Sequence, residues 1–281
     1  MKFKLKTMAP VAVAVAALCG APAVFAASTV ANVQLSLGNS ATSSENNNDA
    51  LLENNSLQNA NGNISVNAAA GVNNAQANST ALSSAMSGNA GAYALSGQVA
   101  AGSYYSGESN TNDAYIRDNA LQNAKGNISV NAAAGEGNQQ QNGLAVSVSN
   151  APLANATAVV FGVQATVGNT YSYDDASNEA EIEDQGLQNA AGNISVNIAA
   201  GAGNQQGNST AIAVSNKGLA NATAVSLQLS AFNNTFDNDD NYNEAALEQN
   251  ALQNAQGNIA VNLAAGNGNQ QSNSLAIAVT K

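Results

Sequence analysis

The chain contains no histidine and no tryptophan, and its single cysteine, Cys19, lies near the N-terminus. Histidine is the commonest general base and metal ligand of proteins, and cysteine is needed for disulfides and thiolate metal sites. A catalytic triad in its usual form also requires histidine. These absences exclude a disulfide framework beyond the N-terminal region and make an enzyme a poor interpretation of the sequence.

Basic residues are also scarce. Only Arg117, Lys125, Lys217 and Lys281 follow residue 26, against 18 acidic residues, so that part of the chain has a net charge of −14. Such a chain is repelled by nucleic acid phosphates and by anionic lipid head groups. No apolar run after residue 26 approaches the roughly 20 residues that span a bilayer. We therefore expect neither nucleic acid binding nor membrane insertion.

Residues 1–26 have the layout of a secretory signal peptide. Three lysines among the first six residues precede an apolar run that ends in Val24-Phe25-Ala26. We predict cleavage after Ala26. Residues 27–281 would then be an exported chain, located at the cell surface or outside the cell.

The chain does contain a segment that is repeated four times. "GNISVNIAAGAGNQQ" at 192–206 has close copies that begin at residues 126 and 257 and a looser copy that begins at residue 62. The Leu-Gln-Asn-Ala before each copy recurs after 64, 66 and 65 residues, and a fixed period of this kind indicates units that pack on their neighbours. We predict a single repeat domain over 27–281. Its repeat cores are 57–82, 121–146, 187–214 and 252–279, separated by the acidic segments 83–120, 147–186 and 215–251.

Apolar residues alternate with polar ones inside each core, which is the period of a β-strand. In the third unit Ile194, Val196 and Ile198 fall on one face, and polar residues fall on the other. A glycine-rich turn at 201–203 and a second alternating run follow, and a third run, as at 159–163, precedes an acidic segment. The pattern predicts an all-β fold, a β-solenoid or cross-β stack with about three strands per rung and four rungs.

Asn, Gln and Ala recur at equivalent places in the units, which favours a stack over a sandwich. A sandwich core interlocks unlike side chains. In a stack with rungs about 4.8 Å apart, identical amides lie over one another and hydrogen-bond to the rungs above and below. The alternative of a disordered low-complexity segment leaves the Ile/Val alternation unexplained. The residues predicted to carry assembly are Asn127, Ile128, Val130, Asn131, Asn138, Gln140, Asn193, Ile194, Val196, Asn197, Asn204, Gln206, Asn258, Ile259, Val261, Asn262, Asn269 and Gln271.

The segment "GNISVNIAAGAGNQQGNST" resembles the repeats of the Fap functional amyloid subunits, which are secreted bacterial proteins. Their imperfect repeats carry Gly-Asn-Ile/Val, Val-Asn, Ala-Ala-Gly and Asn-Gln-Gln elements, and the resemblance covers the four cores. It implies assembly into extracellular fibres of the biofilm matrix, with the cores as the fibre-forming elements. It also implies related fibre subunits and a dedicated outer-membrane export channel as partners.

Two patterns resemble known sites without meeting their requirements. The Gly-x-Gly at 135–137 and at 201–203 lacks the third glycine and the helix of a dinucleotide loop, so no cofactor is expected. Carboxylates crowd at 179–184, but such a run is more often a solvated face than an acid–base pair. Neither pattern predicts catalysis.

A weak calcium candidate lies in the last acidic segment. Asp237, Asp239, Asn241 and Glu248 fall at positions 1, 3, 5 and 12 of a calcium loop. Position 6, where that loop needs glycine, is Tyr242. No specific metal site is therefore predicted.

The acidic residues gather between the cores, where we expect loops, because like charges stacked in register would repel one another. The leading hypothesis is a self-assembling structural protein that polymerises by edge-strand addition. The alternative is a monomeric β-solenoid surface protein or adhesin that displays acidic loops. A monomeric solenoid needs capping units, and the absence of one after the fourth unit favours assembly.

Overall fold

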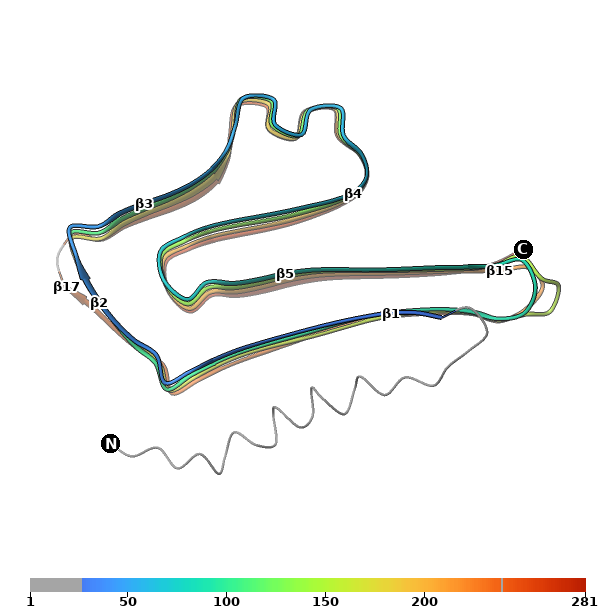
Figure 1. The fold of residues 1–281 in the computed structure, drawn as a ribbon, viewed down its shortest axis with the longest axis horizontal. Helices are drawn as coiled ribbons and strands as arrows, with labels where there is room; N and C mark the ends of the chain where they lie inside the picture. The colour runs from blue at the N-terminus through green and yellow to red at the C-terminus, as the bar shows by residue number, and fades with distance from the viewer. Residues whose placement is uncertain (1–26, 239) are drawn as a thin grey trace.

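A computed structural model describes residues 27–238 and 240–281, which fold into four stacked rungs (Figure 1). These residues form twenty β-strands and no helix. Viewed down the stack, the rungs follow one serpentine path and nearly superimpose (Figure 1). The described residues accordingly include no helix of the length and hydropathy that a membrane span requires. The predicted signal peptide, residues 1–26, lies outside them.

Each rung contributes five strands, and equivalent strands of the four rungs pair into five parallel sheets, each named here after its first-rung strand. The β1 sheet comprises β1 (Ala27–Leu37), β6 (Ala90–Ala101), β11 (Ala156–Val167) and β16 (Ala220–Ala231). The β2 sheet comprises β2 (Ser40–Ser44), β7 (Tyr104–Glu108), β12 (Thr170–Asp174) and β17 (Asn234–Asn238). The β3 sheet comprises β3 (Asn47–Leu52), β8 (Thr111–Ile116), β13 (Ser177–Ile182) and β18 (Tyr242–Leu247). The β4 sheet comprises β4 (Asn61–Ala70), β9 (Lys125–Ala134), β14 (Ala191–Ala200) and β19 (Gln256–Ala265). The β5 sheet comprises β5 (Ala75–Ala85), β10 (Gln139–Ser149), β15 (Gln205–Ser215) and β20 (Gln270–Thr280).

The predicted all-β stack of four rungs is confirmed, but the prediction of about three strands per rung is wrong, because each rung has five. The additional strands are the short ones of the β2 and β3 sheets. Segments such as "SNEAEI" at 177–182 carry carboxylates where a strand would usually carry apolar residues. Their polarity is typical of loops, so alternation of apolar residues alone does not reveal them.

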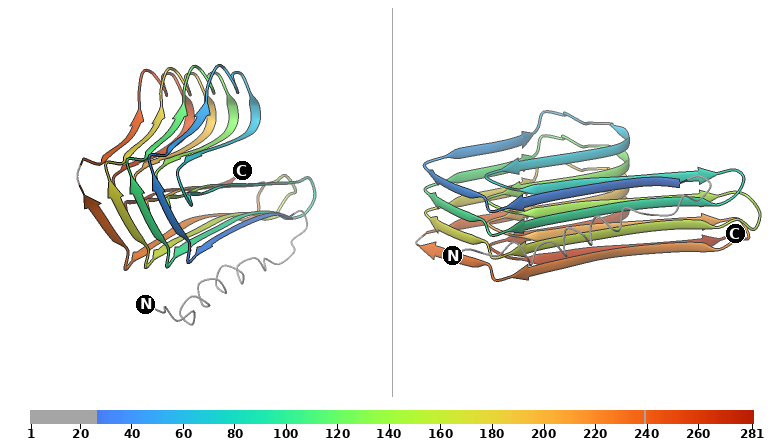
Figure 2. Two further views of the ribbon diagram at one scale, coloured as in Figure 1. Left: turned by 60° about the vertical axis from the view of Figure 1, so that its left-hand side comes forward. Right: turned by 60° about the horizontal axis from the view of Figure 1, so that its bottom comes forward.

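The pairing is in register along the whole stack. Ile64, Ile128, Ile194 and Ile259 are successive partners, and so are the residues on either side of them. Turns take up the differences in repeat length. The turn between β10 and β11 is longer than the turn between β5 and β6, and the corner before β18 is longer than the corner before β13. Insertions there leave the register of every sheet unchanged (Figure 2).

Glycine is required where β4 and its equivalents turn toward the β5 sheet. Gly135 has a φ of +99°, and a Cβ built on it would lie 2.3 Å from the carbonyl oxygen of Gly201 in the next rung. Gly71 and Gly201 make the same close approach to the rungs that follow them. A side chain at this position would collide with backbone, which explains the repeated Ala-Ala-Gly.

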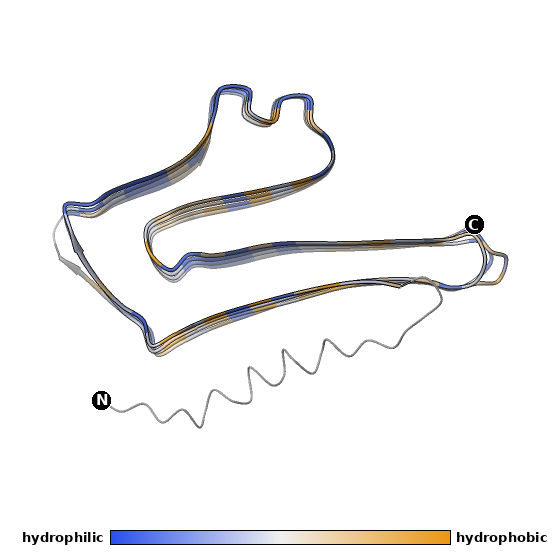
Figure 3. Cartoon of the chain, viewed as in Figure 1, coloured by the Kyte–Doolittle hydropathy of each residue, from blue (hydrophilic) through white to orange (hydrophobic). Residues whose placement is uncertain are grey.

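The sheets enclose two cores of different character. Between the β3 and β4 sheets lie stacked Ile, Val and Leu residues such as Ile116, Ile182, Leu187 and Ile194. Between the β1 and β5 sheets the core is mostly alanine, which lets these two sheets approach closely. Coloured by hydropathy, the four rungs repeat one sequence of polar and apolar bands (Figure 3). Each core therefore continues through the stack, and neither is closed within one rung.

Candidate assembly interface

A row of glutamines runs between the β1 and β5 sheets. The Nε2 of Gln98 donates to the Oε1 of Gln34 at 2.7 Å, and Gln164 and Gln228 continue the row with donations of 2.9 Å each. The Nε2 of Gln164 also donates to backbone carbonyls of the β5 sheet. Gln98 and Gln164 have no exposed surface. This row was not predicted, although a Gln recurs there in every unit.

A double row of asparagines fills the space between the β4 and β5 sheets. Asn197 occupies its centre, where its Nδ2 lies 2.9 Å from the Oδ1 of Asn131 and 3.1 Å from that of Asn142. Its own Oδ1 accepts from Asn262 at 2.9 Å and from Asn208 at 3.0 Å. Each interior amide thus bonds along the stack and across the two sheets. The predicted residues Asn131, Asn197 and Asn262 all belong to this network.

The predicted residues Gln140, Gln206 and Gln271 also stack, beginning from Gln76. The Nε2 of Gln140 donates to the Oε1 of Gln206 at 2.9 Å, and that of Gln206 donates to Gln271 at 3.0 Å. Each Nε2 also bonds a carbonyl of the β4 sheet, for example that of Ile198 at 2.8 Å. The row therefore holds the β4 and β5 sheets together.

The row of Asn138, Asn204 and Asn269 forms only part of the ladder we expected. The Nδ2 of Asn269 donates to the Oδ1 of Asn204 at 3.0 Å, but Asn138 bonds backbone groups. The Oδ1 of Asn138 accepts the backbone N–H of Asn204 at 3.1 Å, and the Nδ2 of Asn138 donates to the carbonyl of Gly201 at 2.9 Å. Its side chain thus bonds one neighbouring rung, since the backbone of Asn138 makes the bond to the other. The reason is that these residues lie at a turn, where the side chain satisfies backbone groups that no strand pairs.

Among residues 27–238 and 240–281, no strand pairs onto the outer edge of the first rung or of the fourth rung, so both ends of this part of the stack are open. The first-rung end presents strands β1–β5, and the fourth-rung end presents β16–β20, so five strand edges lie at each end. Burial changes accordingly, because the equivalent isoleucines Ile128 and Ile194 are 0% exposed whereas Ile259 is 40% exposed. At the fourth-rung end a groove of about 370 Å³ opens between β19 and β20, lined by residues such as Asn258, Val261 and Leu275.

The amide rows give the two ends complementary hydrogen-bonding groups. In the Gln34 row every donor points toward the first rung, so the last oxygen, that of Gln228, faces the fourth-rung end. In the Gln76 row the donors point the other way, so the oxygen of Gln76 faces the first-rung end. A second copy stacked in the same orientation would continue both rows without a mismatch.

The remaining predicted assembly residues lie on the β4 sheet. Asn127, Asn193 and Asn258 form a part-buried row with donations of 2.7 to 2.8 Å between successive rungs. Ile128, Val130, Ile194 and Val196 are fully buried, and Val261 packs against the same core. All predicted positions thus recur at equivalent places on successive rungs.

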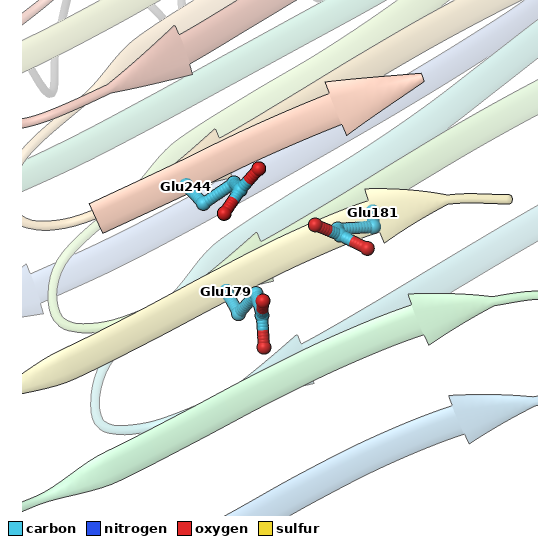
Figure 4. A group of neighbouring side chains, drawn as sticks. All are labelled: Glu179, Glu181 and Glu244. Atoms are coloured by element: carbon cyan, nitrogen blue, oxygen red, sulfur yellow. The ribbon is translucent and has the colours of Figure 1, made fainter. Parts of the chain in front are cut away.

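Some acidic residues lie in turns as expected, such as Asp118 and Asp184, but others lie on strands of the β3 sheet. Asp49, Asp113, Glu179 and Glu244 are register partners on the outward face, one on each rung. We call these four the acid row. Glu179, Glu181 and Glu244 approach one another closely on this face, with one carboxylate oxygen of each within 4.8 Å of the others (Figure 4). Repulsion was expected to keep carboxylates off the strands, but this face is partly exposed and water can screen the charges.

Crowding of carboxylates on this face shifts their protonation. Partial burial and the neighbouring charges of Glu179 and Asp49 raise the pKa of Asp113. Burial, together with Glu179, Glu244 and other nearby carboxylates, raises the pKa of Glu181 to about 7. The Tyr115 hydroxyl donates to Glu179, and burial together with this carboxylate raises the pKa of the phenol. The face therefore binds protons more readily than isolated carboxyls would.

One carboxyl, that of Glu136, is buried inside the stack, with 5% of its surface exposed. Burial raises its pKa to about 7. A cluster with Tyr105, Tyr171 and Tyr173 lies beside it, in which the rings of Tyr105 and Tyr171 stack with centroids 5.4 Å apart. Glu136 lies in the turn between β9 and β10, and its burial follows from the turn it occupies.

The weak calcium candidate falls partly outside the described residues. Asp239 is not among them, and the side chain of Asp237 is not described. The Oδ1 of Asn241 accepts the backbone N–H of Ala176 at 2.7 Å, and Glu248 follows strand β18. The four residues stay a weak candidate, and no specific metal site is predicted from them.

Comparison with known proteins identifies two kinds of similarity. The model of the functional amyloid protein FapB/FapC family matches residues 26–170 and again 157–281. The chain is also 34% identical over 256 residues to the functional amyloid subunit FapC of Pseudomonas aeruginosa, an alignment that covers 79% of this chain and 74% of the relative. No solved structure matches the chain.

Proposed function

Because the chain belongs to the functional amyloid protein FapB/FapC family, we propose that it is a secreted structural subunit that polymerises end to end into extracellular fibres of the biofilm matrix. Residues 27–281 would be the exported part, and the partner would be a further copy of the same chain. A dedicated outer-membrane channel for export and related fibre subunits are proposed as additional partners. The function requires no cofactor and no catalysis.

The observation that carries this proposal is the pair of open ends. Five parallel strand edges at each end present unpaired backbone N–H and C=O groups, and such edges are templates for adding further strands. The interior rungs provide the pattern for the joint, since β6–β10 pair on β1–β5 in perfect register. A fourth rung that pairs with the first rung of another copy would repeat this pattern.

Amide rows would set the orientation and register of the joint. The Gln34 and Gln76 rows continue only when the first rung of one copy meets the fourth rung of the next. Such a head-to-tail contact does not close on itself, so it generates an open filament. Backbone hydrogen bonds would supply affinity, and the Ile/Val core with the amides would supply register.

The test is electron cryomicroscopy and fibre diffraction of residues 27–281. We expect filaments with a reflection at about 4.8 Å along the axis and a subunit rise of about 19 Å, four times the strand spacing. A chain that stays monomeric in sedimentation while showing the circular dichroism of β-strands would contradict the proposal. That result would favour the alternative, a monomeric surface protein or adhesin that displays its acidic face.

A further inference from the structure

The outward face of the β3 sheet carries two rows of charged side chains along the stack. The acid row, Asp49 to Glu244, has a carboxylate on every rung. Beside it runs a second row, in which backbone pairing places Glu53, Arg117, Glu183 and Glu248 on successive rungs. We call this second set the mixed row.

Negative charge in these rows is compensated by a basic side chain at the first-rung end but not at the fourth-rung end. At the first-rung end the Arg117 guanidinium lies 2.9 Å from the carboxylate of Glu53 and over the ring of Tyr115. At the fourth-rung end Glu183 and Glu248 are neighbours in the mixed row. The hydroxyl of Tyr242 donates to Glu244, which is a neutral partner for that carboxylate. The end that presents β18 therefore carries uncompensated negative charge.

End-to-end stacking would bring the two ends of these rows together. Continued register places Glu244 of one copy next to Asp49 of the following copy, and Glu248 next to Glu53, at about the strand spacing of 4.8 Å. Like charges directly opposite each other on neighbouring strands oppose pairing. At the junction, hydrogen bonds between amides inside the stack therefore favour pairing, and repulsion between carboxylates on its surface opposes pairing.

We propose that the junction between copies is an acid-sensitive switch, in which Glu244 and Glu248 of one copy and Asp49 and Glu53 of the next take up protons as the junction forms. This inference rests on the proposed end-to-end polymerisation. Protons shared among the four carboxyls remove the repulsion and allow the amide rows to join. Assembly therefore strengthens as the pH falls and weakens as it rises.

The surroundings of the junction support this direction. Within one copy, stacking already raises the pKa of Asp113 and that of Glu181, because burial and adjacent carboxylates disfavour the charged form. A junction between two copies brings the two carboxylates of one copy next to the two of the following copy, which also raises the pKa of the junction carboxyls. The charged and titratable groups beside the four junction carboxyls on the β3 sheet and its following turns are Asp113, Tyr115, Arg117, Asp118, Glu179, Glu181, Glu183, Asp184 and Tyr242. Lys125 lies at the start of β9, and Glu45, Glu108, Asp174, Asp175 and Asp240 lie in or next to the corners that precede the β3 sheet.

The experiment measures the concentration of soluble chain in equilibrium with fibres of residues 27–281, which contain all four rungs. We expect this concentration to be at least tenfold lower at about pH 5 than at about pH 7.5, since one proton taken up per junction changes the constant about tenfold per pH unit. In Glu244→Gln with Glu248→Gln, the ratio should fall below about threefold, because the fourth-rung end no longer titrates.

A matched control removes the same charge elsewhere. Glu108→Gln with Asp174→Asn alters two neighbouring carboxylates of the β2 sheet on interior rungs, so the tenfold ratio should persist. An undiminished ratio in the Glu244/Glu248 variant, or an equal loss in the control, would overturn the switch and leave polymerisation standing. A failure of every chain to form fibres at either pH would instead contradict the proposed function and the junction together.

Discussion

The amide rows inside the stack and the carboxylate rows on the β3 sheet obey the same in-register geometry with opposite consequences. An amide carries a donor and an acceptor, so Asn197 can bond Asn131 on one rung and Asn262 on another. An ionised carboxylate only accepts, so Asp113 and Glu179 can only repel each other unless a proton, a Tyr hydroxyl or Arg117 intervenes. Stacking identical side chains therefore repeats one interaction on every rung, which is attraction for amides and repulsion for ionised carboxylates. This explains why the interior rows are built of Asn and Gln and why the acids lie on the partly exposed face.

The largest effect is expected when carboxylates are placed in the apolar core. Val196→Asp with Ile198→Asp buries two unpaired charges between the β3 and β4 sheets, where both residues are 0% exposed. We expect fibre formation, followed by thioflavin fluorescence and microscopy, to be abolished or delayed beyond measurement, because an unpaired buried charge costs several kcal/mol or more. The matched variant Met86→Asp with Leu153→Asp changes exposed positions in the turns between the β5 and β1 sheets and should still assemble. Equal behaviour of the two would refute the assignment of faces.

The next effect converts one interior amide into an acid of the same shape. Asn197→Asp loses the donations to Asn131, Asn142 and the carbonyl of Gln141. We expect the free energy of unfolding at neutral pH to fall by about 3 kcal/mol or more, since acceptors would face an unpaired buried charge. Acidification should recover part of the loss. Asn193→Asp, in a more exposed row, should cost less than half as much, and similar denaturation midpoints would argue against the double asparagine row.

A smaller effect concerns the carboxyl of Glu136, which is buried inside the stack. The pKa of Glu136 is raised to about 7 from 4.5 by burial. Its favourable contribution is therefore fully present below about pH 4.5 and is lost as the pH rises through about 7. Glu136→Gln should raise the free energy of unfolding at about pH 8 by up to about 3 kcal/mol and have little effect at about pH 4. Urea titrations at both pH values test this. A variant that is destabilised at pH 8 would show that the carboxylate is stabilised by its tyrosine neighbours, with Glu108→Gln as the exposed control.

The smallest effect is expected on the acid row itself. Asp113→Asn removes the repulsion of Asp113 with Asp49 and with Glu179, and it should raise the free energy of unfolding at neutral pH by about 0.5 kcal/mol or less. Because the pKa of Asp113 is raised in the fold, the gain should vanish as the pH falls through the range in which that carboxyl protonates. Salt should also diminish it. A loss of stability at low salt would mean that this carboxylate makes a favourable contact.

Particular residues show how far the sequence predicts the site. The recurrence of Asn131, Asn197 and Asn262 was sufficient to predict a stacked row, because a fixed period and strand alternation together place equivalent residues in register. The Gln34 row carries the same signal, but three of its members lie in the acidic segments, whose polarity predicts loops. The turn asparagines form the predicted amide bond only between Asn269 and Asn204, whereas the amides of Asn138 and Asn204 bond backbone groups of the next rung. That difference depends on the φ values of the turn, which no repeat pattern reveals.

By itself, the sequence determined the number of rungs, the parallel register and the identity of the core faces. The physical reason is that a near-constant period places equivalent residues over one another, so that apolar residues meet apolar residues and amides meet amides. Only the tertiary structure decided the five-strand serpentine, the location of the acids on strands, and the burial of Glu136 against tyrosines. These features depend on which sheets face each other, and that is set by the corners, where side chains with no apolar periodicity direct the chain.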